Sequence, residues 1–185
     1  MTTFFHVSRF DIAGITSIDK KVIDAEYWYV EDPGKFNKED YLSFLSNHFP
    51  DGVSRHGEQY MLSRWPNATN QEGDEFVRNI NVLEAIFEIV RIYQFPKIIS
   101  RFQSFFGCRT LEDARQIRNT TFNGIGKIYK VECENYFEAD MNLLFTGHHF
   151  SVLIYAEKYW SGEKSDKPFI EVLMEPPLKI ISLIE

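Results

Sequence analysis

Cysteine is scarce in this chain, since its 185 residues include only Cys108 and Cys133. Two cysteines are too few for the disulfide framework of a small secreted domain, and they suit a reducing cytosol. Long hydrophobic runs are also missing, because no apolar stretch approaches the ~18 residues that span a membrane. The first residues show no positively charged segment followed by an apolar one, so we predict no signal peptide. These absences predict a cytoplasmic protein.

An excess of basic residues is missing as well. The formal net charge is −7, so no overall positive field attracts nucleic acid or an anionic membrane. A local basic cleft stays open, with Arg55, His56, Arg64, Arg101 and Arg109 as its candidates. Apolar residues are plentiful at 44%, of which many are aromatic. That content and length predict a single folded domain over residues 1–185.

Hydrophobic periodicity predicts both strands and helices. Helices are expected from Asn37 to about Phe49, over 74–95, and over 110–119 after a capping box at Thr110. Strands are expected over 3–8, 27–30, 98–107, 127–133, 169–174 and 178–184. A turn is expected over 32–34, and the polar stretch 50–73 suggests a long surface connection. Strands and helices do not alternate strictly, which favours an α+β fold.

The segment after Phe150 allows two interpretations. Val152, Ala156 and Tyr159 recur at helical spacing, and Gly162 would end such a helix. A strand over 150–155 is the alternative.

The strand over 169–174 is the most informative stretch of the sequence. Its alternate side chains point to opposite faces, so Glu171 shares a face with Phe169 and Leu173. Burial of an ionised carboxylate without partners is costly. Glu171 therefore lies either on a solvent face with apolar neighbours or in a cleft. A double proline, Pro176-Pro177, separates this strand from the next.

Three motifs occur in order along the chain: Phe5-His6 on the first strand, Ser104-Phe105-Phe106 before a helix containing Ala114, and Glu171 before the prolines. This order resembles the ADP-ribosyltransferase superfamily, specifically its diphtheria-toxin-like branch with a His, an aromatic residue and a Glu. The segment 129–132 also resembles an inner strand of these enzymes. The resemblance implies a compact α+β fold in which two small sheets form an NAD cleft with flanking helices.

The resemblance also implies roles for individual residues. Glu171 would stabilise the positive charge that develops on the ribose when the nicotinamide bond breaks. His6 would be the second catalytic residue and would bind the ribose or the adenosine side of NAD. Phe105 or Phe106 would stack on nicotinamide, and Arg9 would pair with the diphosphate. The implied NAD-binding residues are His6, Ser8, Arg9, Arg101, Ser104, Phe105 and Phe106.

The implied activity is NAD-dependent transfer of ADP-ribose to a macromolecule, with NAD as substrate and no metal. Small transferases of this type resemble bacterial toxins or phage-encoded effectors, and a toxin would have a neutralising partner protein. The acceptor, protein or nucleic acid, stays open. Phe169 stands where transferases that modify arginine often carry Gln or Glu, and phenylalanines replace a usual tyrosine in the middle motif.

Two other functions are weighed against this one. A non-catalytic binding module of the same fold would hold a partner through the aromatic segment Tyr27-Trp28-Tyr29. A metal hydrolase built on His148-His149 is the weakest alternative, because adjacent side chains on a helix or strand point apart.

Overall fold

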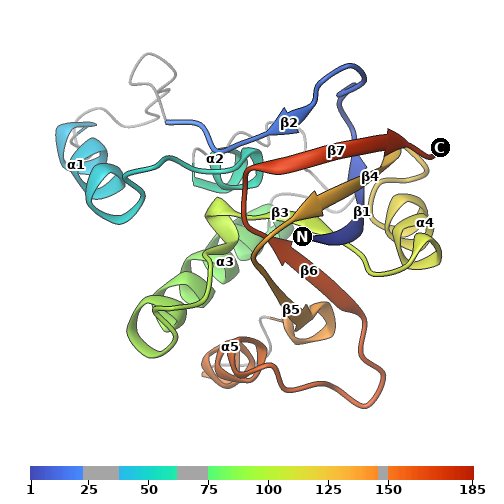
Figure 1. Ribbon diagram of the computed structural model, residues 1–185. Coiled ribbons are helices and arrows are strands. Elements are labelled where there is room, and N and C mark those ends of the chain that lie inside the picture. Colours follow the sequence, from blue (N-terminus) through green and yellow to red (C-terminus); the bar gives the residue numbers. More distant parts are fainter. Residues whose placement is uncertain (23–37, 62–74, 146–149) are drawn as a thin grey trace.

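The computed structural model describes residues 1–22, 38–61, 75–145 and 150–185. Within these ranges the fold is α+β, as predicted, with two antiparallel sheets and five α-helices (Figure 1). The strands are β1 Thr2–Ser8, β2 Ser17–Ile18, β3 Phe105–Gly107, β4 Lys127–Cys133, β5 Tyr136–Asp140, β6 Ile170–Met174 and β7 Leu178–Leu183. The helices are α1 Lys38–His48, α2 Arg55–Met61, α3 Glu75–Gln94, α4 Leu111–Thr120 and α5 Ser151–Ser161, with 3₁₀ turns η2 Arg101–Gln103 and η3 Met141–Leu143.

The two sheets meet along β1 and β3. The larger sheet has the order β1-β4-β7-β2 and the smaller one β3-β6-β5. Phe5 of β1 and Cys108, which follows β3, exchange backbone hydrogen bonds of 2.9 and 2.8 Å. As a result β1 lies beside β3, which in turn pairs with β6. The three strands that carry the sequence motifs are therefore neighbours.

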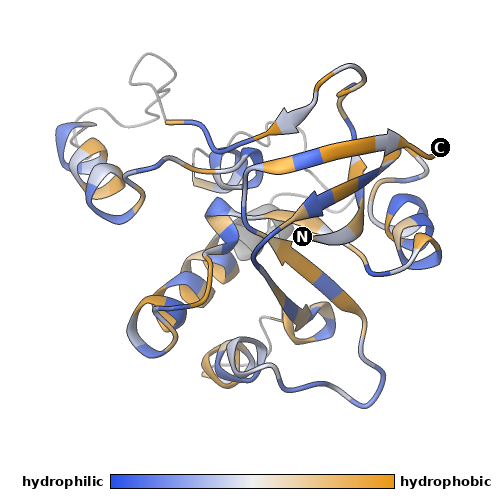
Figure 2. Cartoon of the chain, viewed as in Figure 1, coloured by the Kyte–Doolittle hydropathy of each residue, from blue (hydrophilic) through white to orange (hydrophobic). Residues whose placement is uncertain are grey.

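Strand β6 is buried on both faces, and Figure 2 shows it as mostly hydrophobic. Val172 and Met174 pack with Phe4 and Leu178 in a cluster of residues from both sheets. Leu173 points to the opposite face, where it packs in the core formed with α3 and α5. The predicted alternation is thus confirmed, and it directs Glu171 toward the helices.

Helix α3 forms as predicted and supplies much of this second core. Leu83, Phe87 and Val90 are buried at helical spacing, and α5 packs alongside (Figure 1). The indole Nε1 of Trp160 on α5 donates a 2.7 Å hydrogen bond to the Phe87 carbonyl. This bond satisfies the buried indole N–H and fixes α5 against α3. The alternative interpretation of residues 150–155 as a strand is therefore wrong, because α5 covers Ser151–Ser161.

The expected strand over 98–107 is wrong for most of its length. Only Phe105–Gly107 is extended in a sheet, and η2 precedes it. The hydroxyl oxygen of Ser100 accepts a 3.0 Å bond from the Phe102 amide, which caps η2. A serine cap of this kind offers the backbone a local partner in place of a sheet ladder.

The expected surface connection over 50–73 is also wrong where the structure describes it. Ser54 is buried and its hydroxyl oxygen accepts from the Gly57 amide at 3.2 Å, which starts α2. A Cβ at Gly57 would lie 2.1 Å from the Phe102 carbonyl oxygen. Glycine is therefore required for the close packing of α2 on η2.

Of the remaining secondary-structure predictions, some are confirmed and others concern residues that the structure does not describe. The helix after Thr110 is confirmed, because the Thr110 hydroxyl oxygen accepts from the Asp113 amide at 3.1 Å. Strands over 3–8, 127–133, 169–174 and 178–184 are confirmed within a residue or two. The predicted strand at 27–30 and turn at 32–34 lie outside the described residues. No helix in the described ranges is long and apolar enough to cross a membrane.

Candidate functional site

The carboxylate of Glu171 lies in the core beneath the helices. Its exposed fraction is 3%. One oxygen, Oε1, accepts hydrogen bonds from Arg101 Nη1 at 2.5 Å and from the Tyr159 hydroxyl at 2.6 Å. Of the two interpretations that the sequence left open, the solvent-exposed glutamate is therefore wrong. The bonds in the described part of the chain engage only Oε1.

Arg101 joins Glu171 to a second buried carboxylate. Its Nε and Nη2 donate to the two oxygens of Glu84 at 2.8 and 3.0 Å, in a bidentate pair. The planar guanidinium suits this geometry, since two parallel N–H groups meet two carboxylate oxygens. Arg101 thus connects α3 to β6. We call Glu84, Arg101, Tyr159 and Glu171 the buried ionic cluster.

Two aromatic rings bound this cluster. The His56 ring of α2 lies 4.6 Å from the Phe106 ring, and Arg101 lies 4.8 Å above the same ring. His56 Nε2 also lies 3.3 Å from Glu84 Oε1, within ion-pair distance although without hydrogen-bond geometry. His56 therefore lies beside the same carboxylate that Arg101 holds.

Burial and charge act in opposite directions on these groups. Burial alone would raise the pKa of Glu84, but the charges of Arg101 and His56 hold that pKa well below its usual range. Burial raises the pKa of the Tyr159 phenol, and the Glu171 carboxylate raises it further. Arg101 stays protonated, because the two carboxylates outweigh its burial and raise its pKa. Glu84 and Arg101 are therefore both ionised at neutral pH.

The neighbouring turn of α3 explains why Arg101 lies here. Glu88 accepts bonds from Arg91 at 3.1 and 2.8 Å and from the Ser100 hydroxyl at 2.9 Å. Arg91 in turn donates to the Ile98 carbonyl at 2.9 Å. These bonds anchor the chain before η2 to α3. Ser100 is thereby fixed one residue before Arg101.

His6 lies near the buried ionic cluster but is not part of it. Its Nδ1–H donates a 2.7 Å bond to the Phe106 carbonyl, and its ring lies 6.2 Å from Phe105. Burial lowers the pKa of His6, and the bond to Phe106 opposes that shift. The sequence argument expected His6 and Glu171 in one cleft. The structure instead places them on two sides of β3, where Phe106 contacts His6 through its backbone and Arg101 through its ring.

The other predicted site residues have local roles in the structure. The Ser8 hydroxyl donates to the Phe10 carbonyl at 2.8 Å, and Arg9 lies 5.1 Å from the Phe122 ring. Ser104 is fully buried and donates to the Ser100 carbonyl at 2.7 Å. Phe105 packs with the cluster between the sheets. Of the predicted set, Arg101 is the residue that forms a hydrogen bond and an ion pair with Glu171.

Sequence reasoning missed Glu84 and Tyr159 as site residues, and it named His56 only as a candidate for a local basic cleft. The sequence could have identified Glu84, because this charged residue lies between Leu83 and Phe87 on the apolar stripe of α3. A charged residue on such a stripe requires a buried partner. His56 lies beside the Glu84 carboxylate, a contact that the interpretation of its segment as a surface connection did not predict.

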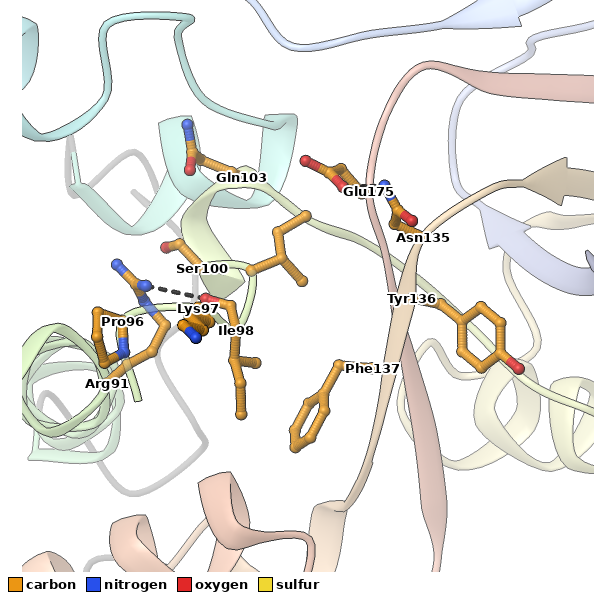
Figure 3. Close-up of a pocket in the computed structure, with 11 residues that line it drawn as sticks. Arg91, Pro96, Lys97, Ile98, Ser100, Gln103, Asn135, Tyr136, Phe137 and Glu175 are labelled. Atoms are coloured by element: carbon orange, nitrogen blue, oxygen red, sulfur yellow. Dashed lines mark hydrogen bonds between the residues drawn. The ribbon is translucent and has the colours of Figure 1, made fainter. Parts of the chain in front are cut away.

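A surface hollow of about 490 Å³ is lined by none of the residues of the buried ionic cluster (Figure 3). It lies between the segment 96–103 and the turn that joins β4 to β5, with Glu175 at its edge. Glu175 accepts a 2.9 Å bond from Asn135 Nδ2. Neither Glu171 nor His6 lines this hollow. The described residues contain no group of three potential metal ligands, and His148 and His149 lie outside them.

The fold and the site define an α+β protein whose two sheets adjoin at β1 and β3, with a buried ionic cluster under its helices. The chain belongs to the family described as "Protein of unknown function (DUF2441)", whose model matches residues 24–185. A search of curated proteins found no match.

Proposed function

We propose that this protein transfers ADP-ribose from NAD to a macromolecular acceptor, with Glu171 as the catalytic carboxylate. The observation that carries the proposal is the arrangement of Glu171, which is buried, held by Arg101 and Tyr159 through one oxygen, and without a hydrogen bond on the other in the described part of the chain.

The strand arrangement supports this proposal. The resemblance to ADP-ribosyltransferases rests on motifs in β1, β3 and β6, which are far apart in sequence. In the fold these strands are consecutive neighbours, through the Phe5–Cys108 bridge and the pairing of Phe106 with Leu173. A chance match of short motifs would not require such adjacency.

The chemistry suits a fixed and poorly solvated carboxylate. When the bond between nicotinamide and ribose breaks, its electron pair leaves with nicotinamide and positive charge develops on the ribose. The acceptor nucleophile then attacks the ribose carbon and loses its proton. Glu171 would stabilise the developing charge through Oε2, because Arg101 and Tyr159 keep Oε1 in place. Preorganised electrostatics of this kind is commonly the largest catalytic contribution.

The residues around Glu171 set a condition on substrate access. Glu171 is 3% exposed, and the ring centroids of His56 and Phe106 lie 4.6 Å apart beside the cluster. Substrate binding at Glu171 would therefore require the side chains around it to move. His6 fits a role at the edge of the site, because its Nδ1–H is used by Phe106 and its Nε2 is left to accept from a ribose hydroxyl.

The test is the substitution Glu171→Gln. The amide keeps the shape and a hydrogen-bonding oxygen but removes the charge that faces the transition state. We expect NAD affinity to change little and turnover to fall by at least ~100-fold. The measurements are nicotinamide release and calorimetric titration with NAD. Incubation with labelled NAD and lysate, followed by nuclease or protease digestion, identifies the acceptor class.

Two further variants make the result interpretable. Glu175→Gln changes a carboxylate just after the same strand that accepts a hydrogen bond from Asn135, and it should leave turnover unchanged. Tyr159→Phe keeps the charge of Glu171 but removes one of its bonds, and it should reduce turnover less than Glu171→Gln. Parental turnover in Glu171→Gln would show that Glu171 is a structural ion-pair partner, and would favour a non-catalytic binding protein.

A further inference from the structure

The surface hollow of Figure 3 is separate from the buried ionic cluster and has two walls. One wall is the segment 96–103, which includes Lys97. The other wall is formed by the turn between β4 and β5, which includes Asn135, and by Glu175. Its volume of about 490 Å³ lies within the range of roughly 300–1,000 Å³ that is common for small-molecule sites. The hollow is therefore large enough to hold a small ligand.

The two walls carry opposite charges. Lys97 is exposed and Glu175 is partly buried, and Figure 3 shows them on separate sides of the hollow. In the described part of the chain neither of them forms an ion pair. A third charged residue, Arg91, is already paired with Glu88 through bonds of 3.1 and 2.8 Å. Among the lining residues that the structure describes, a ligand therefore meets one available cation and one available carboxylate.

The surroundings of Glu175 favour a group that donates hydrogen bonds. Glu175 Oε2 accepts a 2.9 Å bond from Asn135 Nδ2. Within the described ranges, Glu175 Oε1 and Asn135 Oδ1 are left without a hydrogen bond. An ammonium group has three donors and no acceptor, so it matches a carboxylate and a neighbouring amide oxygen. This wall therefore suits the amino group of a ligand.

The lining also includes a group of apolar side chains. Ile98, Ile99 and Phe137 line the hollow, and all three pack against the core between α3 and α5. The Phe137 ring stacks on Trp160 with the ring centroids 5.8 Å apart. These side chains would shield apolar parts of a ligand from water. The hollow thus combines two separated charges with an apolar surface.

Both walls are held in place by bonds within the protein. Arg91 Nη1 donates a 2.9 Å bond to the Ile98 carbonyl, which fixes the chain beside Lys97. The Glu175 amide donates a 2.9 Å bond to the Asn135 carbonyl, which fixes the opposite wall. A site whose walls are fixed in advance loses less conformational entropy when a ligand binds.

We infer that the hollow binds a short apolar peptide with free termini, with its amino group at Glu175 and its carboxylate at Lys97. The two charges select a zwitterion, and the apolar lining selects its side chains. A cube of the same volume has an edge of about 8 Å, which roughly two extended residues span. The ligand class is therefore a dipeptide rather than a single amino acid. The inference is independent of the proposed function, because no residue proposed to act on NAD lines the hollow.

The test is an NMR titration of the isotope-labelled full chain with the dipeptide leucyl-leucine. Chemical shifts should change at residues 96–99 and 135–137. The N-acetyl form lacks the ammonium group and the C-terminal amide form lacks the carboxylate, so each should bind about tenfold more weakly than the free dipeptide. Glycyl-glycine should also bind more weakly, because it has no apolar side chain to bury.

Two variants assign each terminus of the dipeptide to a wall. Glu175→Gln should weaken binding of leucyl-leucine about tenfold but leave the affinity for the N-acetyl form unchanged, because that form has no ammonium group. Lys97→Gln should show the corresponding pattern with the C-terminal amide form. Lys164→Gln changes an exposed lysine outside the hollow, and this matched control should bind the dipeptide as the parent does. Thermal melting verifies that each variant is folded.

The outcomes are distinct from those that test Glu171. Glu175→Gln should lose peptide affinity while it turns over NAD as the parent does, so each proposal can fail without the other. Absence of leucyl-leucine binding by the parent protein, or equal losses in Lys97→Gln and Lys164→Gln, overturns the peptide site. Binding of the blocked forms as tightly as the free dipeptide, or of leucine as tightly as leucyl-leucine, also overturns it.

Discussion

Two ionic clusters in this protein have opposite compositions and opposite surroundings. In the core, Arg101 lies between Glu84 and Glu171. At the surface, Glu185 lies between Arg115 and Arg118, and Arg118 Nη2 is 3.1 Å from its carboxylate. Both central groups bind two partners of opposite charge. The difference between the clusters is access to water.

That difference decides what each cluster contributes. The surface pairs are screened by solvent and salt, so their loss is easily compensated by hydration. In the core no water replaces a lost partner, and removal of one member leaves an uncompensated charge. Loss of one charged partner should therefore destabilise the fold much more in the core cluster than in the surface cluster, although the hydrogen-bond patterns of the two are similar. A buried cluster of this kind also orients its members rigidly, as catalysis at Glu171 would require.

The largest effect is expected from Arg101→Met. This change leaves Glu84 and Glu171 buried without their shared cation, and we expect a loss of about 3–5 kcal/mol in the free energy of unfolding. Urea denaturation measures the loss. Arg115→Met is the matched surface change and should leave the denaturation midpoint unchanged. Similar midpoints for the two variants would show that the core cluster is more hydrated than its burial indicates.

Leu83 on α3, the helix that also carries Glu84, provides an apolar substitution for comparison. Leu83 is 7% exposed and packs in the core with Phe87 and Trp160. Leu83→Ala removes buried methyl groups and leaves a cavity, so we expect a loss of about 2–5 kcal/mol, measured by the same urea titration. A loss below that range would mean that the core relaxes around the site or that the stripe of α3 is less tightly packed.

The smallest of the three expected effects is a loss of stability at acidic pH. The pKa of Glu84 is lowered in the folded state, so the unfolded chain binds more protons. Its contribution to stability is complete above the unfolded pKa of about 4.3 and is lost as pH falls below that value. We expect Glu84→Gln to flatten this acid dependence, measured as melting temperature against pH.

Salt separates the two clusters in this experiment. The hydrogen bonds from Arg115 lower the pKa of Glu185 and give an acid dependence of the same sign. High salt should weaken the surface contribution but leave that of Glu84, because buried pairs are screened much less. An acid dependence that disappears in salt and is unaffected by Glu84→Gln would contradict this assignment.

Much of the secondary structure could be predicted because its causes are local. The alternation of β4, the apolar stripe of α3, the Thr110 cap and the stop at Pro176-Pro177 depend on neighbours within a few residues. The failures share a different cause. η2 replaces an expected strand because Ser100 caps it and Glu88 holds Ser100 from another element.

The candidate site shows the same division. Alternation in the sequence placed Glu171 on the face of Leu173 and posed the choice between a solvent face and a cleft. Only the tertiary structure excluded the solvent face, because the partners Arg101 and Tyr159 come from separate elements, and Arg101 lies 70 residues away. The separation of His6 from Glu171 likewise follows from the order of β1, β3 and β6. Strand order is set by contacts distant in sequence, and periodicity, which is a local property, carries no information about them.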